Sequence, residues 1–218
     1  MHHHRAIGRD RVCAAVLFGA LLTAAGGLSA CSSSGMRGDD GGTFAFHSPG
    51  GQVEIFYDEA QRRPLAGFAG ESLMDPDEEI ALSDFDGQIV VLNAWGQWCA
   101  PCRAEVDDLQ EVHEELQAGS TPIGTVLGIN VRDYNPQIAR DFVQDNGVTY
   151  PSIYDPPFKT AASLGGVPSS VIPTTVVLDA QHRPAAVFLR EVTADDILQV
   201  TAELESELEQ EANKGGAA

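Results

Sequence analysis

Cys99 and Cys102 stand two residues apart in the segment WCAPC and are the first candidates for chemistry. In an exported protein, a C-x-x-C pair can be a structural disulfide, half of a metal site or a catalytic dithiol. A disulfide that closes so short a loop adds little stability. A tetrahedral zinc site needs about four ligands, and the sequence places His47, His113 and His182 far from each other. These facts favour a catalytic dithiol and leave the other two interpretations open.

The residues around the pair predict where it lies in a fold. Residues 88–95 read QIVVLNAW, a continuous apolar run typical of a strand covered on both faces. From Cys102 onward, apolar residues recur at three- and four-residue spacing until Gly119, which predicts a helix. Pro101 suits the first turn of that helix. The dithiol should therefore sit between the carboxyl end of a strand and the amino end of a helix, where backbone N–H groups stabilise a thiolate. In this arrangement the outer residue, Cys99, is the expected nucleophile, and Cys102 is the expected resolving thiol.

The segment NAWGQWCAPCRAE at residues 93–105 closely resembles thioredoxin-like proteins of the TlpA/ResA/CcmG group. By pattern, the similarity runs from about residue 82 to residue 208, and its W-C-x-P-C core is specific. The resemblance implies an extracytoplasmic, membrane-tethered thiol–disulfide oxidoreductase that alternates between a dithiol and a Cys99–Cys102 disulfide. It implies neither a cofactor nor a metal.

The resemblance also assigns residues that receive the substrate. Pro173 precedes the apolar run TTVVLD, where thioredoxin-like proteins have a cis-proline that faces the dithiol, and Pro168 is the second choice. A cis-proline there would expose the backbone of Ile172 for pairing with a substrate peptide. Trp98 and Thr174 complete the expected substrate-binding set.

Glu105 follows Cys102 by three residues, close to one helical turn. A glutamate at this spacing is an acid/base in the resembled group, so Glu105 is expected to take the proton from Cys102; the alternative is an exposed helix carboxylate. Asn93 stands where cytoplasmic thioredoxins carry a buried aspartate. Asp107 replaces a proline that is common in the group, which predicts a less kinked helix and a different direction for Glu105.

The rest of the chain fits an α/β, thioredoxin-like fold with an N-terminal extension and a central insertion. Its expected elements are strands at residues 122–130, 152–155, 174–179 and 185–190, helices at 136–147 and 193–208, and one or two helical turns at 158–164. Residues 43–81 precede this pattern and are expected to add a hairpin. The domain is predicted to cover residues 43–212, followed by a disordered tail at 213–218.

The N-terminus has the pattern of an export signal. A start rich in arginine leads into an apolar run at residues 12–28, which indicates a secretory leader rather than a spanning helix. Residues 28–31 read LSAC and resemble the bacterial lipobox, which implies cleavage after residue 30 and a lipid on Cys31. Residues 31–42 are then the lipidated cysteine and a flexible tether. The expected location is the outer face of the cell membrane, with the lipid as anchor.

The net charge and the resemblance limit the classes of partner that this protein can have. The net charge of −19 disfavours nucleic acid. By resemblance, the substrate is an oxidised protein thiol, first of all the C-x-x-C-H of apocytochrome c, with electrons from a CcdA- or DsbD-type membrane carrier. One alternative is a DsbE-like oxidase that forms disulfides in exported proteins, because the motif does not fix the direction of electron flow. A second alternative is a lipoprotein that binds a metal without catalysis.

Overall fold

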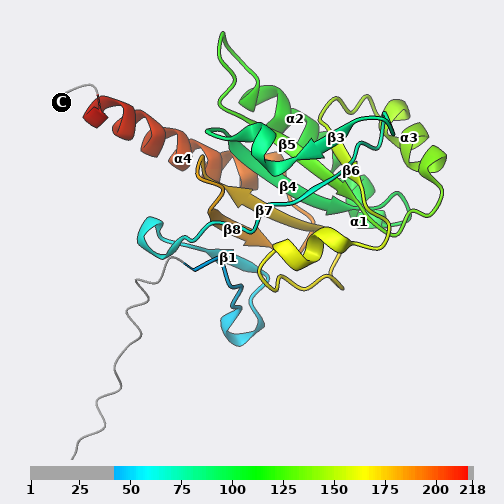
Figure 1. The fold of residues 1–218 in the computed structure, drawn as a ribbon, viewed down its shortest axis with the longest axis horizontal. Helices are drawn as coiled ribbons and strands as arrows, with labels where there is room; N and C mark the ends of the chain where they lie inside the picture. Colours follow the sequence, from blue (N-terminus) through cyan, green and yellow to red (C-terminus); the bar gives the residue numbers. More distant parts are fainter. Residues whose placement is uncertain (1–41, 216–218) are drawn as a thin grey trace, which may run out of the picture. The chain divides into compact units, whose positions relative to one another are not determined.

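The computed structural model describes residues 42–215 as a mixed α/β unit (Figure 1). The expected leader, Cys31 and almost all of the tether lie outside the described residues. Six strands form one sheet in the order β1-β8-β7-β4-β5-β6, and β2 and β3 form a separate hairpin. The strands are β1 (Glu54–Phe56), β2 (Ala69–Glu71), β3 (Glu79–Ala81), β4 (Ile89–Trp95), β5 (Gly124–Asn130), β6 (Ser152–Tyr154), β7 (Thr174–Leu178) and β8 (Pro184–Phe188). The α-helices are α1 (Ala100–Ala104), α2 (Val106–Leu116), α3 (Pro136–Asp145) and α4 (Ala194–Gly215).

The strand β4 is the centre of the sheet and carries the dithiol at its carboxyl end. It pairs with β5 in parallel and with β7 in antiparallel orientation. Every residue of β4 and β5 is buried, as their continuous apolar sequences predict for strands with both faces covered. A parallel pair needs a long crossover, which α1 and α2 supply. The element order of the sequence-based prediction, including the insertion with β6, is confirmed.

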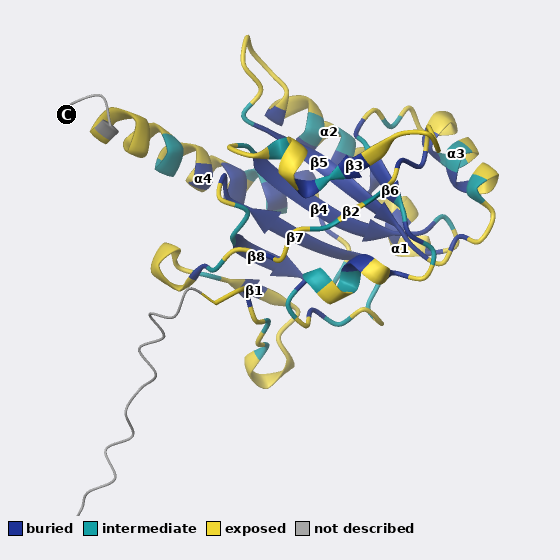
Figure 2. Cartoon of the chain, viewed as in Figure 1, coloured by how far each residue is buried: buried dark blue, intermediate teal, exposed yellow. Residues whose placement is uncertain are grey.

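Two hydrophobic layers cover the two faces of the sheet. The central strands between them are buried (Figure 2). On one face, α2 and α4 pack their apolar sides against Val91, Val126 and Val177. On the other face, Val90 and Leu127 pack against the N-terminal extension and the central insertion. The insertion contributes a 3₁₀ helix at Lys159–Ser163, where one or two helical turns are predicted. These layers hold β4 rigidly, so the residues that follow it have a fixed position.

The helix after the dithiol is interrupted at Glu105, contrary to the expectation of a less kinked helix. Its two parts, α1 and α2, meet at this residue although no proline follows. Contacts with the loop before α4 hold the joint instead: the Glu105 carboxylate accepts the N–H of Val192, and Asp108 accepts the N–H of Ala194. The side chain of Glu105 therefore turns into the protein.

The N-terminal extension contributes more than the hairpin that the sequence predicts. The hairpin is present as β2 and β3. In addition, β1 joins the edge of the main sheet by antiparallel pairing with β8, with Ile55 opposite Val187. At the other end, α4 continues to Gly215, three residues past the expected domain boundary. No helix within residues 42–215 is both long enough and apolar enough to cross a membrane.

Gly128 in β5 gives a test of how tightly the sheet is packed beside the site. A methyl group on Gly128 would overlap the Ser152 hydroxyl and come within 2.8 Å of the Trp95 indole nitrogen. We expect Gly128→Ala to lower the free energy of unfolding by about 1–3 kcal/mol, the usual cost of overpacking a core. Urea denaturation measures this, with Gly67→Ala as the matched control because its methyl group would meet nothing within 4 Å. Equal effects of the two substitutions would contradict this packing.

Candidate active site

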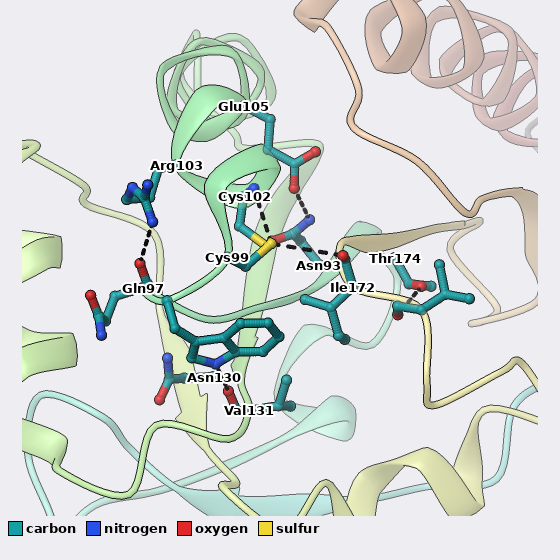
Figure 3. Close-up of a disulfide and its surroundings, with 12 residues drawn as sticks. Asn93, Gln97, Cys99, Cys102, Arg103, Glu105, Asn130, Val131, Ile172 and Thr174 are labelled. Atoms are coloured by element: carbon teal, nitrogen blue, oxygen red, sulfur yellow. Dashed lines mark hydrogen bonds between the residues drawn. A yellow bond between two sulfur atoms is a disulfide. The ribbon is translucent and has the colours of Figure 1, made fainter.

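The dithiol lies at the junction that the sequence predicts, between β4 and α1 (Figure 3). Cys99 is the N-cap of α1, and its sulfur accepts the backbone N–H of Cys102 at 3.2 Å. Pro101 occupies the first turn of the helix. The two cysteines form a disulfide, so the structure is that of the oxidised protein. In the reduced protein, the same backbone N–H would stabilise a thiolate on Cys99.

The two sulfurs face different surroundings. Both cysteines are 4% exposed, so exposure does not distinguish them. The Cys99 sulfur lies 3.7 Å from the carbonyl oxygen of Ile172, on the side of the loop before β7. Cys102 instead lines a small internal cavity with Asn93 and Tyr150. This difference suits an outer, attacking Cys99 and an inner, resolving Cys102.

The loop before β7 has the geometry that the resemblance implies. The Ile172–Pro173 peptide bond is cis, and it places the Ile172 carbonyl beside Cys99. Pro168, the second choice, does not have a cis bond within the described residues. Thr174 is buried, and its hydroxyl donates to the carbonyl of Val171. Thr174 therefore supports this loop from inside and does not present its side chain to a substrate.

Trp98, directly before Cys99, is an exposed aromatic residue beside the dithiol. It is 43% exposed, and its indole nitrogen donates to the carbonyl of Val131 at 3.1 Å. An exposed aromatic ring held in this way offers a rigid apolar contact to a polypeptide.

Glu105 is completely buried and takes part in a polar network. Its two carboxylate oxygens accept the side-chain N–H of Asn93 at 2.8 Å and the backbone N–H of Val192 at 3.0 Å. Asn93 also donates to the Thr175 hydroxyl, so it links β4, β7 and the helix joint. The structure thus excludes the alternative of an exposed helix carboxylate.

Burial raises the pKa of Glu105 to about 7, from an ordinary value of 4.5. The hydrogen bonds from Val192 and Asn93 lower this pKa, whereas the charges of Glu191 and Asp108 raise it further. Burial outweighs the hydrogen bonds because the ionised carboxylate loses its water. A carboxyl group with a pKa near neutrality can both accept and release a proton under physiological conditions.

Tyr150 is a second titratable group in this region. It lines the same cavity as Cys102, and burial, followed by the charge of Glu105, raises the pKa of its hydroxyl. It therefore stays neutral at physiological pH.

The sequence-based prediction missed a turn after β5 that supports the loop before Cys99. Buried Asp133 accepts the backbone N–H of Gln97 at 2.9 Å and the side-chain N–H of Asn130 at 2.8 Å. Polar residues directly after a buried strand next to β4 were the available signal, because parallel strands end at the same edge of a sheet. Asp133 fixes the loop that carries Trp98.

Comparison with known proteins identifies the family of this chain. The family described as AhpC/TSA matches residues 66–183, more than half of the chain. The chain belongs to this family. One similar protein is the thiol-disulfide oxidoreductase ResA of Geobacillus thermodenitrificans, 29% identical over 121 residues that cover 56% of this chain and 66% of ResA. The resemblance to the ResA group is thereby confirmed.

Two solved structures from Corynebacterium are more similar in sequence. A secreted thiol-disulfide isomerase from Corynebacterium glutamicum is 71% identical with a TM-score of 0.73, over 74% of this chain and 97% of the other. A DsbF homologue from Corynebacterium diphtheriae is 67% identical with a TM-score of 0.70, over 74% of this chain and 99% of the other. These structures confirm the thioredoxin-like fold. Together with the disulfide between Cys99 and Cys102, they make this chain a thiol–disulfide oxidoreductase.

Proposed function

We propose that this protein exchanges disulfides with exported polypeptides outside the cytoplasm. The observation that carries the proposal is the contact between the Cys99 sulfur and the carbonyl of Ile172, the residue that precedes the cis-proline Pro173. An extended substrate chain that pairs with the backbone of Ile172 would bring its own sulfur next to Cys99. Trp98 supplies the adjacent apolar contact.

The roles of the two cysteines follow from their positions. In the reduced protein, the Cys99 thiolate attacks one sulfur of the substrate disulfide, and the other substrate sulfur leaves as a thiolate that takes a proton. This step forms a mixed disulfide between Cys99 and the substrate. Cys102 then attacks the Cys99 sulfur, which releases the substrate thiol and forms the Cys99–Cys102 disulfide. Glu105 accepts the proton that Cys102 loses, and two electrons have passed to the substrate. The same steps in reverse take two electrons from a substrate dithiol and form its disulfide.

The proposal also includes a direction of electron flow between the protein and its substrate. Reduction of apocytochrome c is the first prediction from the sequence. The two Corynebacterium proteins at 71% and 67% identity are described as an isomerase and a DsbF homologue, which favours formation or rearrangement of disulfides. We therefore propose formation or rearrangement of substrate disulfides as the first candidate. Reduction of the C-x-x-C-H of apocytochrome c, with a CcdA- or DsbD-type electron donor, is the second candidate and is supported by the match to ResA.

The equilibrium reduction potential of the Cys99–Cys102 pair separates the two candidates. Glutathione or dithiothreitol buffers of graded potential would set the equilibrium, and mass spectrometry after thiol alkylation would read it. We expect a value between about −180 mV, typical of protein disulfide isomerase, and about −120 mV, typical of DsbA. A value near that of thioredoxin, about −270 mV, would contradict disulfide formation and favour the reductase.

The proposed location is the outer face of the cell membrane, with a lipid on Cys31. The lipobox-like sequence at residues 28–31 supports this location, and the similar Corynebacterium glutamicum protein is described as secreted. Substitution Cys31→Ala should release the mature protein from the membrane fraction. An unchanged membrane association of this variant would overturn the lipid anchor.

A further inference from the structure

Two cationic side chains contact the loop that precedes Cys99. The guanidinium of Arg103 donates to the carbonyl of Gln97 at 2.9 Å (Figure 3). On the Trp98 side, the guanidinium of Arg132 lies 5.9 Å from the centre of the indole ring and donates to the carbonyl of Ser169. Both arginines are exposed. Both guanidinium groups therefore contact residues of the segment that directly precedes Cys99, Arg103 at Gln97 and Arg132 at Trp98.

A third cation lies at the same end of the sheet. Arg140 donates to the carbonyl of Leu73, and Leu73 packs in one cluster with Cys99 and Cys102. Within residues 42–215, none of Arg103, Arg132 and Arg140 forms an ion pair with a carboxylate. Their charges are therefore available to a partner.

The acidic groups near the dithiol are mostly turned away from this surface. Glu105 is buried in its network, and the Asp133 carboxylate points inward to the N–H groups of Gln97 and Asn130. Asp108 accepts the N–H of Ala194. Asp107 is the exposed acidic residue closest in sequence to Arg103. The chain carries only 13 lysines and arginines against 32 acidic residues, so unpaired cations around the reactive pair stand out from its overall charge.

Exposed apolar side chains lie on the same segments of the chain as these cations. Trp98 is exposed beside Cys99, and Tyr134, directly after Asp133, is 77% exposed. Ile138 in the first turns of α3 is also exposed. An aromatic and aliphatic patch with cations at its edge fits a polypeptide that carries both apolar and acidic side chains.

We propose that the surface formed by Trp98, Tyr134, Arg103 and Arg132 selects cysteine-containing polypeptides with acidic side chains next to the cysteine. This inference rests on the proposed function and adds the class of substrate to it. Arg132 holds Trp98 on one side and Ser169 on the other, so it joins the loop before Cys99 to the loop before Pro173. A carboxylate at the substrate cysteine would meet this guanidinium as the substrate docks.

Screening explains how a protein of charge −19 can favour an acidic partner. At an ionic strength of about 0.15 M, charges interact over about 8 Å, so distant acidic residues act weakly on the dithiol. Many of those acids lie on α4, whose carboxyl-terminal end projects from the opposite end of the unit to α1 (Figure 1). The contacts with Arg103 and Arg132 are short and are retained at this ionic strength.

The test compares three disulfide-bonded peptides that differ only beside the cysteine, where they carry glutamate, glutamine or lysine. The full-length protein reacts with each peptide in a glutathione redox buffer, which returns the dithiol to its starting state and permits exchange in either direction, and kcat/KM for exchange is measured at about 0.15 M salt. We expect kcat/KM for the glutamate peptide to exceed that for the lysine peptide by about three- to tenfold, the effect of one or two exposed ion pairs. At about 1 M salt this preference should largely disappear, because the screening length falls to about 3 Å.

Charge-reversal variants test whether Arg103 and Arg132 cause the preference for the glutamate peptide. Arg132→Glu and Arg103→Glu should each bring the glutamate-to-lysine ratio to one or below, whereas Lys214→Glu on α4 changes the net charge equally and should leave the ratio unchanged. The glutamine peptide reports any change in the reactivity of the Cys99 thiolate, which would alter all three rates together. A ratio near one in the natural protein, or a ratio that persists in both arginine variants, would overturn the inference. Absence of exchange with all three peptides would overturn the proposed function, and the inference with it.

Discussion

The Cys99→Ala variant is expected to lose thiol–disulfide exchange down to the background rate of the assay thiol. Cys99 carries the sulfur that caps α1 and lies beside the Ile172 carbonyl, where the substrate disulfide is proposed to dock. Cys102 lines the internal cavity, so its thiol cannot readily reach a polypeptide docked at Ile172. Reduction of insulin and refolding of a reduced, disulfide-containing protein would both measure the loss.

The same variant should keep its fold. The disulfide closes a very short loop, so its removal changes the free energy of unfolding little. Circular dichroism and thermal unfolding of Cys99→Ala therefore serve as the control. Exchange activity that survives in a folded Cys99→Ala protein would show that the attacking thiol has been assigned wrongly.

The Glu105→Gln variant is expected to change how stability depends on pH. Burial raises the pKa of Glu105 from 4.5 to about 7. Between these values the folded protein holds a proton that the unfolded chain releases, so stability falls as pH rises through this window. The contribution of Glu105 to the free energy of unfolding is fully present below about pH 4.5 and is lost as pH rises past about 7. The total change is about 3 kcal/mol, because one pKa unit corresponds to about 1.4 kcal/mol.

Glutamine cannot ionise, so this loss should be absent from the variant. As pH rises from about 4 to about 8, the free energy of unfolding of Glu105→Gln should increase by about 3 kcal/mol relative to that of the natural protein. Urea denaturation of the oxidised proteins across this range measures the difference, and Glu209→Gln, on the exposed face of α4, is the control. Parallel stability curves for Glu105→Gln and the natural protein would contradict the raised pKa.

Glu105→Gln should also alter the pH dependence of exchange. If the ionised carboxylate accepts the proton from Cys102, the resolving step should accelerate as pH rises through about 7 in the natural protein. The variant should lose this inflection. Stopped-flow decay of a preformed mixed disulfide would measure it, and this readout separates proton transfer from a purely structural effect.

Much of the site could be predicted because its signals are local in the sequence. The buried run before Cys99 and the helical spacing after Cys102 indicate a strand–helix junction without knowledge of any other segment. Pro173 could be predicted from its place before an apolar run, together with the resemblance. These signals need only a few residues each.

The features that were missed depend on partners far away in the chain. β1 is only three residues long, and its pairing with β8 has no local signature. Asp133 gains its role because β5 lies next to β4, which brings its carboxylate to Gln97. The interruption at Glu105 arises from contacts with the loop before α4, almost ninety residues later, and not from a proline. These three features therefore depend on tertiary contacts.

The most direct test of the account is to trap the mixed disulfide with the Cys102→Ala variant. The reduced variant would be incubated with a disulfide-bonded polypeptide, and the product analysed on a non-reducing gel and by peptide mass spectrometry. The account predicts a dithiothreitol-sensitive adduct joined through Cys99, and no adduct when Cys99 is also replaced by alanine. Absence of an adduct with Cys102→Ala, or an adduct through Cys102 in the Cys99→Ala protein, would contradict it.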